Sequence, residues 1–353
     1  MSLIRSFVAA RPGYLAVLLA ATLFHVEIAH CEGAQRDSEK PIVPSDPALA
    51  EAKSLLQQGK LNEAEHQVRQ RLQTQPQSAD AHFLLGYILF REIKAAVEPF
   101  ADQYSGFHEP DPKFRNEKAS ESLAQFTEGA KYHDPSAFDL KIVALDYLLF
   151  GSYTDADKWL TKSLEWNPRD PQAWYYLGLT KYNKNRFEEA VGAFKKCLEL
   201  DPDNVNAEDN LGLSYAGLGR WEDAIAAYQK AIAWQSQSLD RKPGPFLNLG
   251  TLLLAQNRAA EALPHLQNAV EISPADREAH QQLGKAYSVL DRLPEAQAEL
   301  EKAVQIDPQS APLHFMLGQI YRREGLSEKA KNEFDRTASL NATPPSKATP
   351  NSR

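Results

Sequence analysis

The sequence predicts an all-α fold, an α-solenoid of about eight stacked helix hairpins. The main observation is a small residue followed twelve positions later by Ala, a pair that recurs every 34 residues along most of the 353-residue chain. A fixed period in the range of roughly 20–50 residues indicates stacked units around one continuous core. Gly inside a helix costs roughly 1 kcal/mol relative to Ala, so its recurrence indicates that two helices approach closely at this position. The predicted packing pairs are Ala52 with Ala64, Gly86 with a displaced partner at Ala119, Ala144 with Ala156, Gly178 with Ala190, Gly212 with Ala224, Gly250 with Ala262, Gly284 with Ala296, and Gly318 with Ala330.

Composition places the chain among folded soluble proteins. Hydrophobic residues make up 43% and charged residues 24% of the sequence, both ordinary values. The formal net charge is −8 and no run of Lys and Arg occurs. A nucleic-acid surface needs clustered basic residues, so nucleic acid is not an expected partner.

The N-terminus has the features of a secretory signal peptide. Arg5 and Arg11 precede an apolar run at 14–24, which is too short for the ~20 apolar residues that span a bilayer. We predict a signal peptide at 1–33, a polar linker at 34–44, and an exported protein that is periplasmic or extracellular. Two alternatives, an uncleaved anchor and lipidation near Cys31, are the only predicted routes to a membrane. Cleavage leaves Cys197 as the sole cysteine, predicted to be a small buried residue.

The repeat pattern divides 45–344 into eight units, and the Pro-bearing segment 345–353 is predicted to be a disordered tail. Unit 171–204 shows the pattern most clearly. Trp174, Leu177 and Gly178 share one helical face, a second helix carries Phe194, and Asp201-Pro202 ends that helix before the next unit. The predicted units are 45–78, 79–136, 137–170, 171–204, 205–238, 243–276, 277–310 and 311–344.

The second unit is 58 residues long and contains an insert at 93–116. Pro99, Pro110 and Pro112 are expected to break any helix there. The insert nevertheless holds four aromatic residues, more than a disordered loop would carry. Its role as a lid over the repeats, a cap on their outer face, or a recognition element is left open by the sequence.

These units resemble the tetratricopeptide repeat (TPR) family. The family pattern W-x2-L-G-x2-Y, followed by A-x3-F-x2-A and Pro, is matched by Trp174, Leu177, Gly178, Ala190, Phe194, Cys197 and Pro202. Seven units keep the spacing. The resemblance implies a right-handed superhelix whose concave face binds peptides or partner proteins.

The concave face is predicted from the stripe of each first helix that lies opposite its packing face. Its character changes from aromatic near the N-terminus to polar near the C-terminus. Asn210 and Asn248 match the family position at which Asn can bond a ligand backbone. The predicted groove residues are Phe83, Tyr87, Phe90, Lys141, Leu145, Tyr175, Leu179, Tyr182, Asn210, Asn248, Gln282 and Arg322.

No catalytic, cofactor or metal-binding constellation is predicted. His82, His280 and His314 look like a cluster until they are placed in the repeat, where all three occupy the packing position of Trp174. Glu261 and His265 are four residues apart on one helix but have no third ligand at helical spacing.

The function predicted from the sequence is a non-enzymatic scaffold of the cell envelope that binds an extended segment or a helix of a protein partner. Two alternatives stay open. One is an interaction module that serves a separate enzyme such as a glycosyltransferase, and the other is a structural spacer that self-associates into homo-oligomers.

Overall fold

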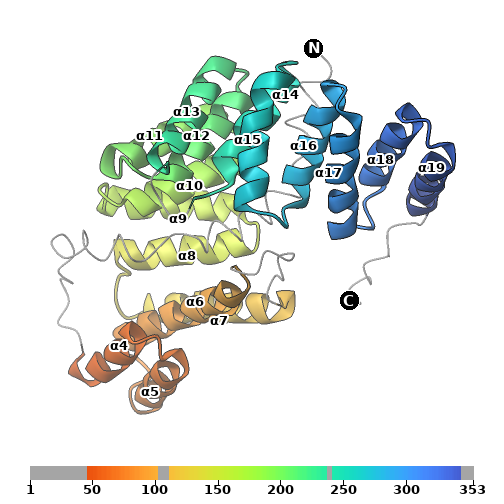
Figure 1. Cartoon of the computed structure of the whole chain (residues 1–353). Helices are drawn as coiled ribbons and strands as arrows, with labels where there is room; N and C mark the ends of the chain where they lie inside the picture. The colour runs from red at the N-terminus through yellow and green to blue at the C-terminus, as the bar shows by residue number, and fades with distance from the viewer. Residues whose placement is uncertain (1–45, 102–110, 237–240, 343–353) are drawn as a thin grey trace. The chain divides into compact units, whose positions relative to one another are not determined.

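The chain forms a succession of α-helices joined by short turns (Figure 1). The computed structural model describes residues 46–101, 111–236 and 241–342, and these ranges hold sixteen α-helices and no strand. The predicted all-α class is therefore confirmed. The predicted signal peptide, linker and C-terminal tail lie outside the described residues.

The helices fall into two compact units. The first unit begins with a short 3-10 helix at Pro47–Leu49 and holds α4 (Ala50–Gln57), α5 (Leu61–Thr74), α6 (Ala79–Ala101), α7 (Pro112–Gly129), α8 (Ala137–Leu149), α9 (Tyr153–Trp166), α10 (Pro171–Asn183), α11 (Phe187–Leu200) and α12 (Val205–Gly217). The second unit holds α13 (Trp221–Trp234), α14 (Gly244–Ala255), α15 (Ala259–Ile272), α16 (Arg277–Val289), α17 (Leu293–Ile306), α18 (Ala311–Arg323) and α19 (Ser327–Ala342).

Within each unit, helices pack on their neighbours along the chain. In the first unit α6 pairs with α7, α8 with α9, and α10 with α11, while α9 also packs on α10 and α11 on α12. The second unit repeats this arrangement with α14 and α15, α16 and α17, and α18 and α19. Each hairpin thus buries its apolar face against the next one, which is the packing expected of a repeat protein.

The turns inside the hairpins require a left-handed backbone at one position of the period. The residue at that position has a φ between 56° and 79° in seven turns. Gly adopts this conformation without strain, and Asn and Asp tolerate it better than other residues. These seven residues are Gly59, Gly151, Asn185, Gly219, Asn257, Asp291 and Gly325.

The helical Gly of the repeat makes room for the residue sixteen positions later. A Cβ added at Gly178 would lie 2.6 Å from Cε1 of Phe194, and one at Gly250 would lie 2.6 Å from Cδ2 of Leu266. The two members of the predicted pair Gly212 and Ala224 lie one in each unit. Where the small residue is Ala, at Ala52 and Ala144, the residue sixteen positions later is aliphatic, namely Val68 and Leu160.

In the second hairpin, the predicted packing pair of Gly86 with Ala119 is wrong. The Cβ position of Gly86 is 2.7 Å from Phe126, and Ser122, four residues before that Phe, donates a 3.0 Å hydrogen bond to the carbonyl oxygen of Gly86. Ser122 therefore takes the place assigned to Ala119. Ala119 and Ser122 are three residues apart on α7 and both are fully buried. Because Ala119 is also small, the sequence pattern selected it as the partner of Gly86. This unit is 24 residues longer than the 34-residue period, and adding that surplus to the usual spacing of twelve residues after Gly86 leads to Ser122.

The insert is more helical than its prolines predicted. Helix α6 continues through Pro99 to Ala101, and α7 begins at Pro112 with Asp111 as its N-cap. Pro99 lies within the last turn of α6, and Pro112 lies at the first position of α7, where Pro is favoured because its missing N–H would be unpaired there. Phe114 is half-buried on α7. The rest of the predicted lid, cap or recognition element falls on residues that the structure does not describe.

A buried carboxyl group joins the second hairpin to the third. Asp146 of α8 is fully buried, and its Oδ2 lies 2.6 Å from Ser122 Oγ. Ser122 has a single hydroxyl proton, and it donates this proton to the Gly86 carbonyl, which can only accept. Its contact with Asp146 is then a second hydrogen bond only if the Asp146 carboxyl is protonated and donates to Ser122. Burial raises the pKa of Asp146 well above its usual value.

Asp146→Asn is expected to change the pH dependence of stability. A carboxyl group whose pKa is raised by folding contributes stability that is complete below its unfolded pKa of about 3.9 and is lost as pH rises through the folded pKa. Asn retains the donor to Ser122 and does not titrate. The variant should therefore gain stability relative to the wild type as pH rises from 4 to 8, with a slope of at most about 1.4 kcal/mol per pH unit. Urea unfolding of both proteins across this range measures it. A stability difference that is the same at pH 4 and pH 8 would contradict a neutral Asp146.

Candidate protein-interaction surfaces

Most of the predicted groove residues are in the interior of the hairpins. Seven of the twelve have less than a tenth of their surface exposed, namely Phe83, Phe90, Lys141, Leu145, Tyr175, Leu179 and Asn210. The prediction that these side chains line an open groove is wrong. The other five, Tyr87, Tyr182, Asn248, Gln282 and Arg322, are partly or fully exposed.

Close packing between the two helices of a hairpin accounts for the burial of the aromatic residues. The ring of Tyr175 lies 6.0 Å from that of Phe194 and 5.5 Å from that of Tyr176. Phe83 lies 6.1 Å from Phe126, and its ring fills the space beside Gly129, where a Cβ would be only 2.6 Å away. Small residues on the second helices thus admit the aromatic side chains of the first helices into the core.

Lys141 is held by an ion pair inside the first unit. Its Nζ lies 2.6 Å from Oδ2 of Asp170, and the Lys141 side chain is 2% exposed. The other oxygen of Asp170 accepts a 3.0 Å bond from the backbone N–H of Ala173 and caps α10. Lys141 therefore joins α8 to the start of α10 and has no free ammonium group to offer a ligand.

The exposed members of the predicted groove are aromatic in the first unit. Tyr87 meets Phe138 edge to face at 4.9 Å, and Arg91 covers its ring at 5.8 Å and donates to its hydroxyl at 3.2 Å. Tyr182 meets Phe187 at 5.3 Å. Both tyrosines are anchored on one side and remain partly exposed, as aromatic contact residues in interfaces are.

In the second unit, Arg322 belongs to an exposed aromatic patch on the last hairpin. Its guanidinium lies 5.8 Å from the ring of Phe334, which in turn lies 5.8 Å from the ring of Phe315. Phe315 is 46% exposed. An exposed Phe beside a cation offers a partner both apolar area and charge.

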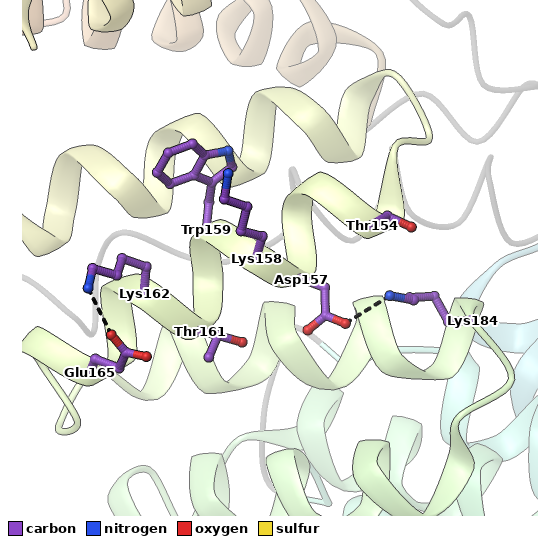
Figure 2. A pocket seen from close by; sticks show the side chains of 8 residues that line it. All are labelled: Thr154, Asp157, Lys158, Trp159, Thr161, Lys162, Glu165 and Lys184. Carbon is purple, nitrogen blue, oxygen red and sulfur yellow. Dashed lines mark hydrogen bonds and ion pairs between the residues drawn. The ribbon is translucent and has the colours of Figure 1, made fainter.

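A shallow depression of about 580 Å³ lies against α9, and no groove residue was predicted there. Figure 2 shows its lining, which includes Thr154, Asp157, Lys158, Trp159, Lys162 and Lys184. The Lys158 ammonium is 4.5 Å from the ring centroid of Trp159. The interpretation based on first helices missed this surface because α9 is the second helix of its hairpin. The spacing of Lys158, Trp159 and Lys162 along α9 is the sequence signal that could have identified this surface.

One carboxylate at the edge of this depression binds three cations. Asp157 lies 2.7 Å from Lys181, 2.9 Å from Lys184 and 3.4 Å from Arg186, and Lys181 and Arg186 also pair with Glu189. We refer to these five residues as the Asp157 cluster. Burial acts to raise the pKa of Asp157, but the bonds and charges of Lys181 and Lys184 outweigh it and the pKa is lowered. The cluster holds α9 to α10 and carries one more cation than carboxylates.

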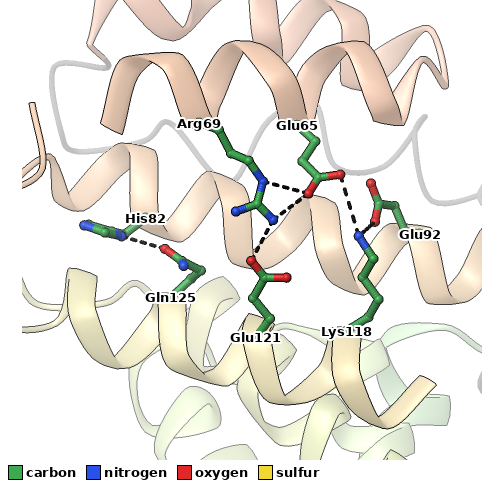
Figure 3. A network of polar contacts seen from close by, with 7 residues as sticks. All are labelled: Glu65, Arg69, His82, Glu92, Lys118, Glu121 and Gln125. Carbon is green, nitrogen blue, oxygen red and sulfur yellow. Dashed lines mark hydrogen bonds and ion pairs between the residues drawn. The ribbon is translucent and has the colours of Figure 1, made fainter. Parts of the chain in front are cut away.

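A second polar network, drawn in Figure 3, ties the first hairpin to the second. Arg69 of α5 bridges Glu65 and Glu121 at 2.6 Å each, and Lys118 of α7 reaches Glu92 at 2.5 Å and Glu65 at 3.6 Å. Burial is the main cause that raises the pKa of Glu92, and its bond with Glu65 adds to the effect. The ion pairs connect α5, α6 and α7, so this network stabilises the interface between the two hairpins, although Oε1 of Glu92 is buried without a hydrogen-bond partner.

His82, His280 and His314 occupy the same position of the repeat, and each contacts a backbone carbonyl with one ring nitrogen and a side chain with the other. The Nε2 atoms of His82, His280 and His314 lie 2.9, 2.8 and 3.1 Å from the carbonyl oxygen of a Pro six residues earlier. Their Nδ1 atoms meet a Gln or Glu of the following helix at 2.5–2.7 Å. Burial would lower the pKa of His280, but its bonds with Glu299 and the Pro274 carbonyl outweigh this and raise it.

The described residues hold neither a metal-binding cluster nor a membrane-spanning helix. Within 46–101, 111–236 and 241–342, no group of three or more His, Cys, Asp or Glu side chains is arranged to hold a metal ion. In the same ranges, no helix combines the length and apolar character needed to cross a membrane.

Sequence comparison identifies the repeats. Five family models, each described as tetratricopeptide repeat, match residues 49–97, 171–204, 203–275, 253–303 and 311–344. Among curated proteins, none matches the chain.

Solved structures share this architecture. The chain is similar to YrrB, described as a TPR protein with an unusual peptide-binding site, at 27% identity over 51% of this chain and 91% of YrrB, with a TM-score of 0.44. It is similar to MamA from Desulfovibrio magneticus RS-1 at 23% identity over 50% of this chain and 97% of that protein, with a TM-score of 0.45. The APC/C hetero-tetramer Cut9–Hcn1 matches over 85% of this chain and 54% of the other, at 16% identity and a TM-score of 0.51, and shows the fold alone.

Proposed function

Because this chain is a tetratricopeptide repeat protein, we propose that it is a non-enzymatic scaffold that binds a protein or peptide partner. Proteins built from these repeats generally act as protein-interaction scaffolds, and stacked hairpins provide an extended binding surface. The observation that carries the proposal is the set of anchored and only partly buried aromatic rings on the first helices of the hairpins, at Tyr87 and Tyr182.

The binding mode we propose is an extended segment or a helix of the partner lying across the first helices. Tyr87 and Tyr182 provide rigid amphipathic contacts in the first unit, and Arg322 with Phe315 provides a second contact region in the other unit. Tyr and Arg are enriched among the residues that dominate binding energy at interfaces. The seven buried residues of the predicted groove support these contacts from beneath and do not touch the partner.

A photoreactive amino acid at Tyr182 tests this mode in the native host. We expect the substituted protein to crosslink a discrete partner on irradiation. The matched control places the same amino acid at Leu200, which is 38% exposed on the second helix of the same hairpin, and should give no such product. Equal crosslinking from both positions, or none from either, would contradict groove binding at this hairpin.

We also propose that the protein is exported and works in the cell envelope. The basic and apolar segment at the N-terminus is the support for this proposal. N-terminal sequencing of the protein purified for the crosslinking experiment tests whether the N-terminal segment is cleaved. A first residue between 30 and 35 is expected, and an intact Met1 in the envelope fraction would contradict cleavage.

A further inference from the structure

The exposed face of α9 carries two Trp side chains, each with a Lys ammonium over its ring. Lys158 lies 4.5 Å from the ring centroid of Trp159, and Lys162 lies 5.4 Å from that of Trp166. Trp166 is 48% exposed, the most of any Trp on the described helices. Residues at i, i+3 and i+7 of a helix share one face, so Trp159, Lys162 and Trp166 form a continuous stripe on α9. Trp159 and Lys162 line the depression, and Trp166 extends the stripe beyond it.

The depression has a positive charge balance although the chain as a whole has a net charge of −8. Its lining holds three cations, Lys158, Lys162 and Lys184, and two carboxylates, Asp157 and Glu165. Glu165 pairs with Lys162 at 3.0 Å, and Asp157 pairs with Lys184 at 2.9 Å. Within the described part of the chain Lys158 has no carboxylate partner, only the Trp159 ring.

We propose that this surface, which we call the α9 depression, docks an acidic segment of a partner protein, and the proposal rests on the scaffold function proposed above. Carboxylates of the segment pair with Lys158 and Lys162, which are one helical turn apart on α9. An aliphatic side chain between those carboxylates packs on the Trp159 and Trp166 rings as the two ammonium groups turn toward the ligand. Lys is well suited to this because its long stem is flexible and its charge is not tied to one geometry. The surface lies on a second helix, so it extends the binding repertoire beyond the first helices.

Binding of a synthetic probe peptide to the full chain tests the proposal. The probe is three repeats of Glu-Glu-Leu with blocked termini, and the matched neutral peptide has Gln in place of every Glu. The chain has five Trp residues, so the indole N–H region of the NMR spectrum contains few signals. Trp159→Phe and Trp166→Phe assign the two signals of interest. The Glu peptide should shift both of them, the Gln peptide should shift them much less, and the shift should weaken as salt screens the charges.

Charge reversal provides the decisive comparison. The double variant Lys158→Glu, Lys162→Glu should weaken binding of the Glu peptide at least fivefold. Lys196→Glu is the matched control, because Lys196 has the repeat position of Lys162 and likewise pairs with a Glu three residues later, at 2.6 Å. It should change binding less than twofold. Circular dichroism of each variant confirms that the helices are intact.

Several results would overturn the assignment. Equal shifts from the Glu and Gln peptides would show an apolar contact without preference for acid. Shifts confined to Trp174, Trp221 or Trp234 would place binding elsewhere, and no shift from either peptide at millimolar concentration would show that the surface does not bind. Tighter binding of a ten-residue oligothymidylate than of the Glu peptide would identify a nucleic-acid surface instead. If the peptide fails while photocrosslinking at Tyr182 succeeds, only the α9 assignment falls and the scaffold function stands.

Discussion

Asp170→Ala is expected to lower the free energy of unfolding by about 3–5 kcal/mol, because it leaves a buried ammonium group without its partner. The Lys141 side chain is 2% exposed and its Nζ lies 2.6 Å from Asp170 Oδ2. The same substitution removes the side chain that caps α10 by accepting from the N–H of Ala173, which costs about 1 kcal/mol by itself. Urea unfolding monitored by circular dichroism measures the total.

Asn204→Ala separates the two contributions. Asn204 caps α12 by accepting a 2.8 Å bond from the N–H of Ala207, and it is not paired with a buried cation. Its loss should cost only about 1 kcal/mol. Adding Lys141→Met to Asp170→Ala removes the unpaired charge and should recover most of the larger loss. Equal costs for Asp170→Ala and Asn204→Ala would show that the ammonium of Lys141 finds water or another partner.

Gly178→Ala is expected to lower the free energy of unfolding by about 1–2 kcal/mol, although Ala is the better helix former. The new Cβ would lie 2.6–2.8 Å from three atoms of the Phe194 ring, and that ring is fully buried. Overpacking a core costs typically about 1–3 kcal/mol, and the gain in helix propensity offsets at most about 1 kcal/mol of it. Thermal and urea unfolding give the comparison with the wild type.

Gly192→Ala is the matched control on the same hairpin. Gly192 lies on the exposed face of α11, and a Cβ built there meets no atom within 4 Å. This variant should be more stable than the wild type by about 0.5–1 kcal/mol. Combining Gly178→Ala with Phe194→Leu reproduces the Ala144 and Leu160 combination of the previous hairpin and should recover part of the loss. Gly178→Ala that stabilises as much as Gly192→Ala would mean that the Phe194 ring can move aside without cost.

The α9 depression and the partly buried tyrosines Tyr87 and Tyr182 are separable from this core. Lys158 and Lys162 are exposed, and neither Tyr87 nor Tyr182 is fully buried. Substitutions at these positions should therefore alter binding with little change in stability, whereas those at Asp170 or Gly178 should alter stability first. Binding data from any variant need this comparison before a residue is assigned to a contact.

The sequence alone was sufficient to predict the helical class and the 34-residue period of the hairpins. These properties are local. Each of the signals acts within one or two helices. They are the 34-residue spacing of small residues, the Pro two residues after helices such as α11, and Gly, Asn or Asp at the left-handed turn position. A wrong partner for Gly86 arose only where the insert interrupts the period, and Ala119 and Ser122 share one face of α7.

Only the tertiary structure decided which side chains face solvent. Tyr175 and Tyr182 lie on one helix and were predicted to share one stripe, yet the first is 2% exposed and the second is only partly buried. The difference depends on what the neighbouring helices place against each ring, Phe194 against the first and Phe187 against the second. Lys141 is buried for the same kind of reason, since Asp170 comes from the start of the next hairpin. Burial and ion pairing depend on atoms distant in the chain, and the period of one helix carries no information about them.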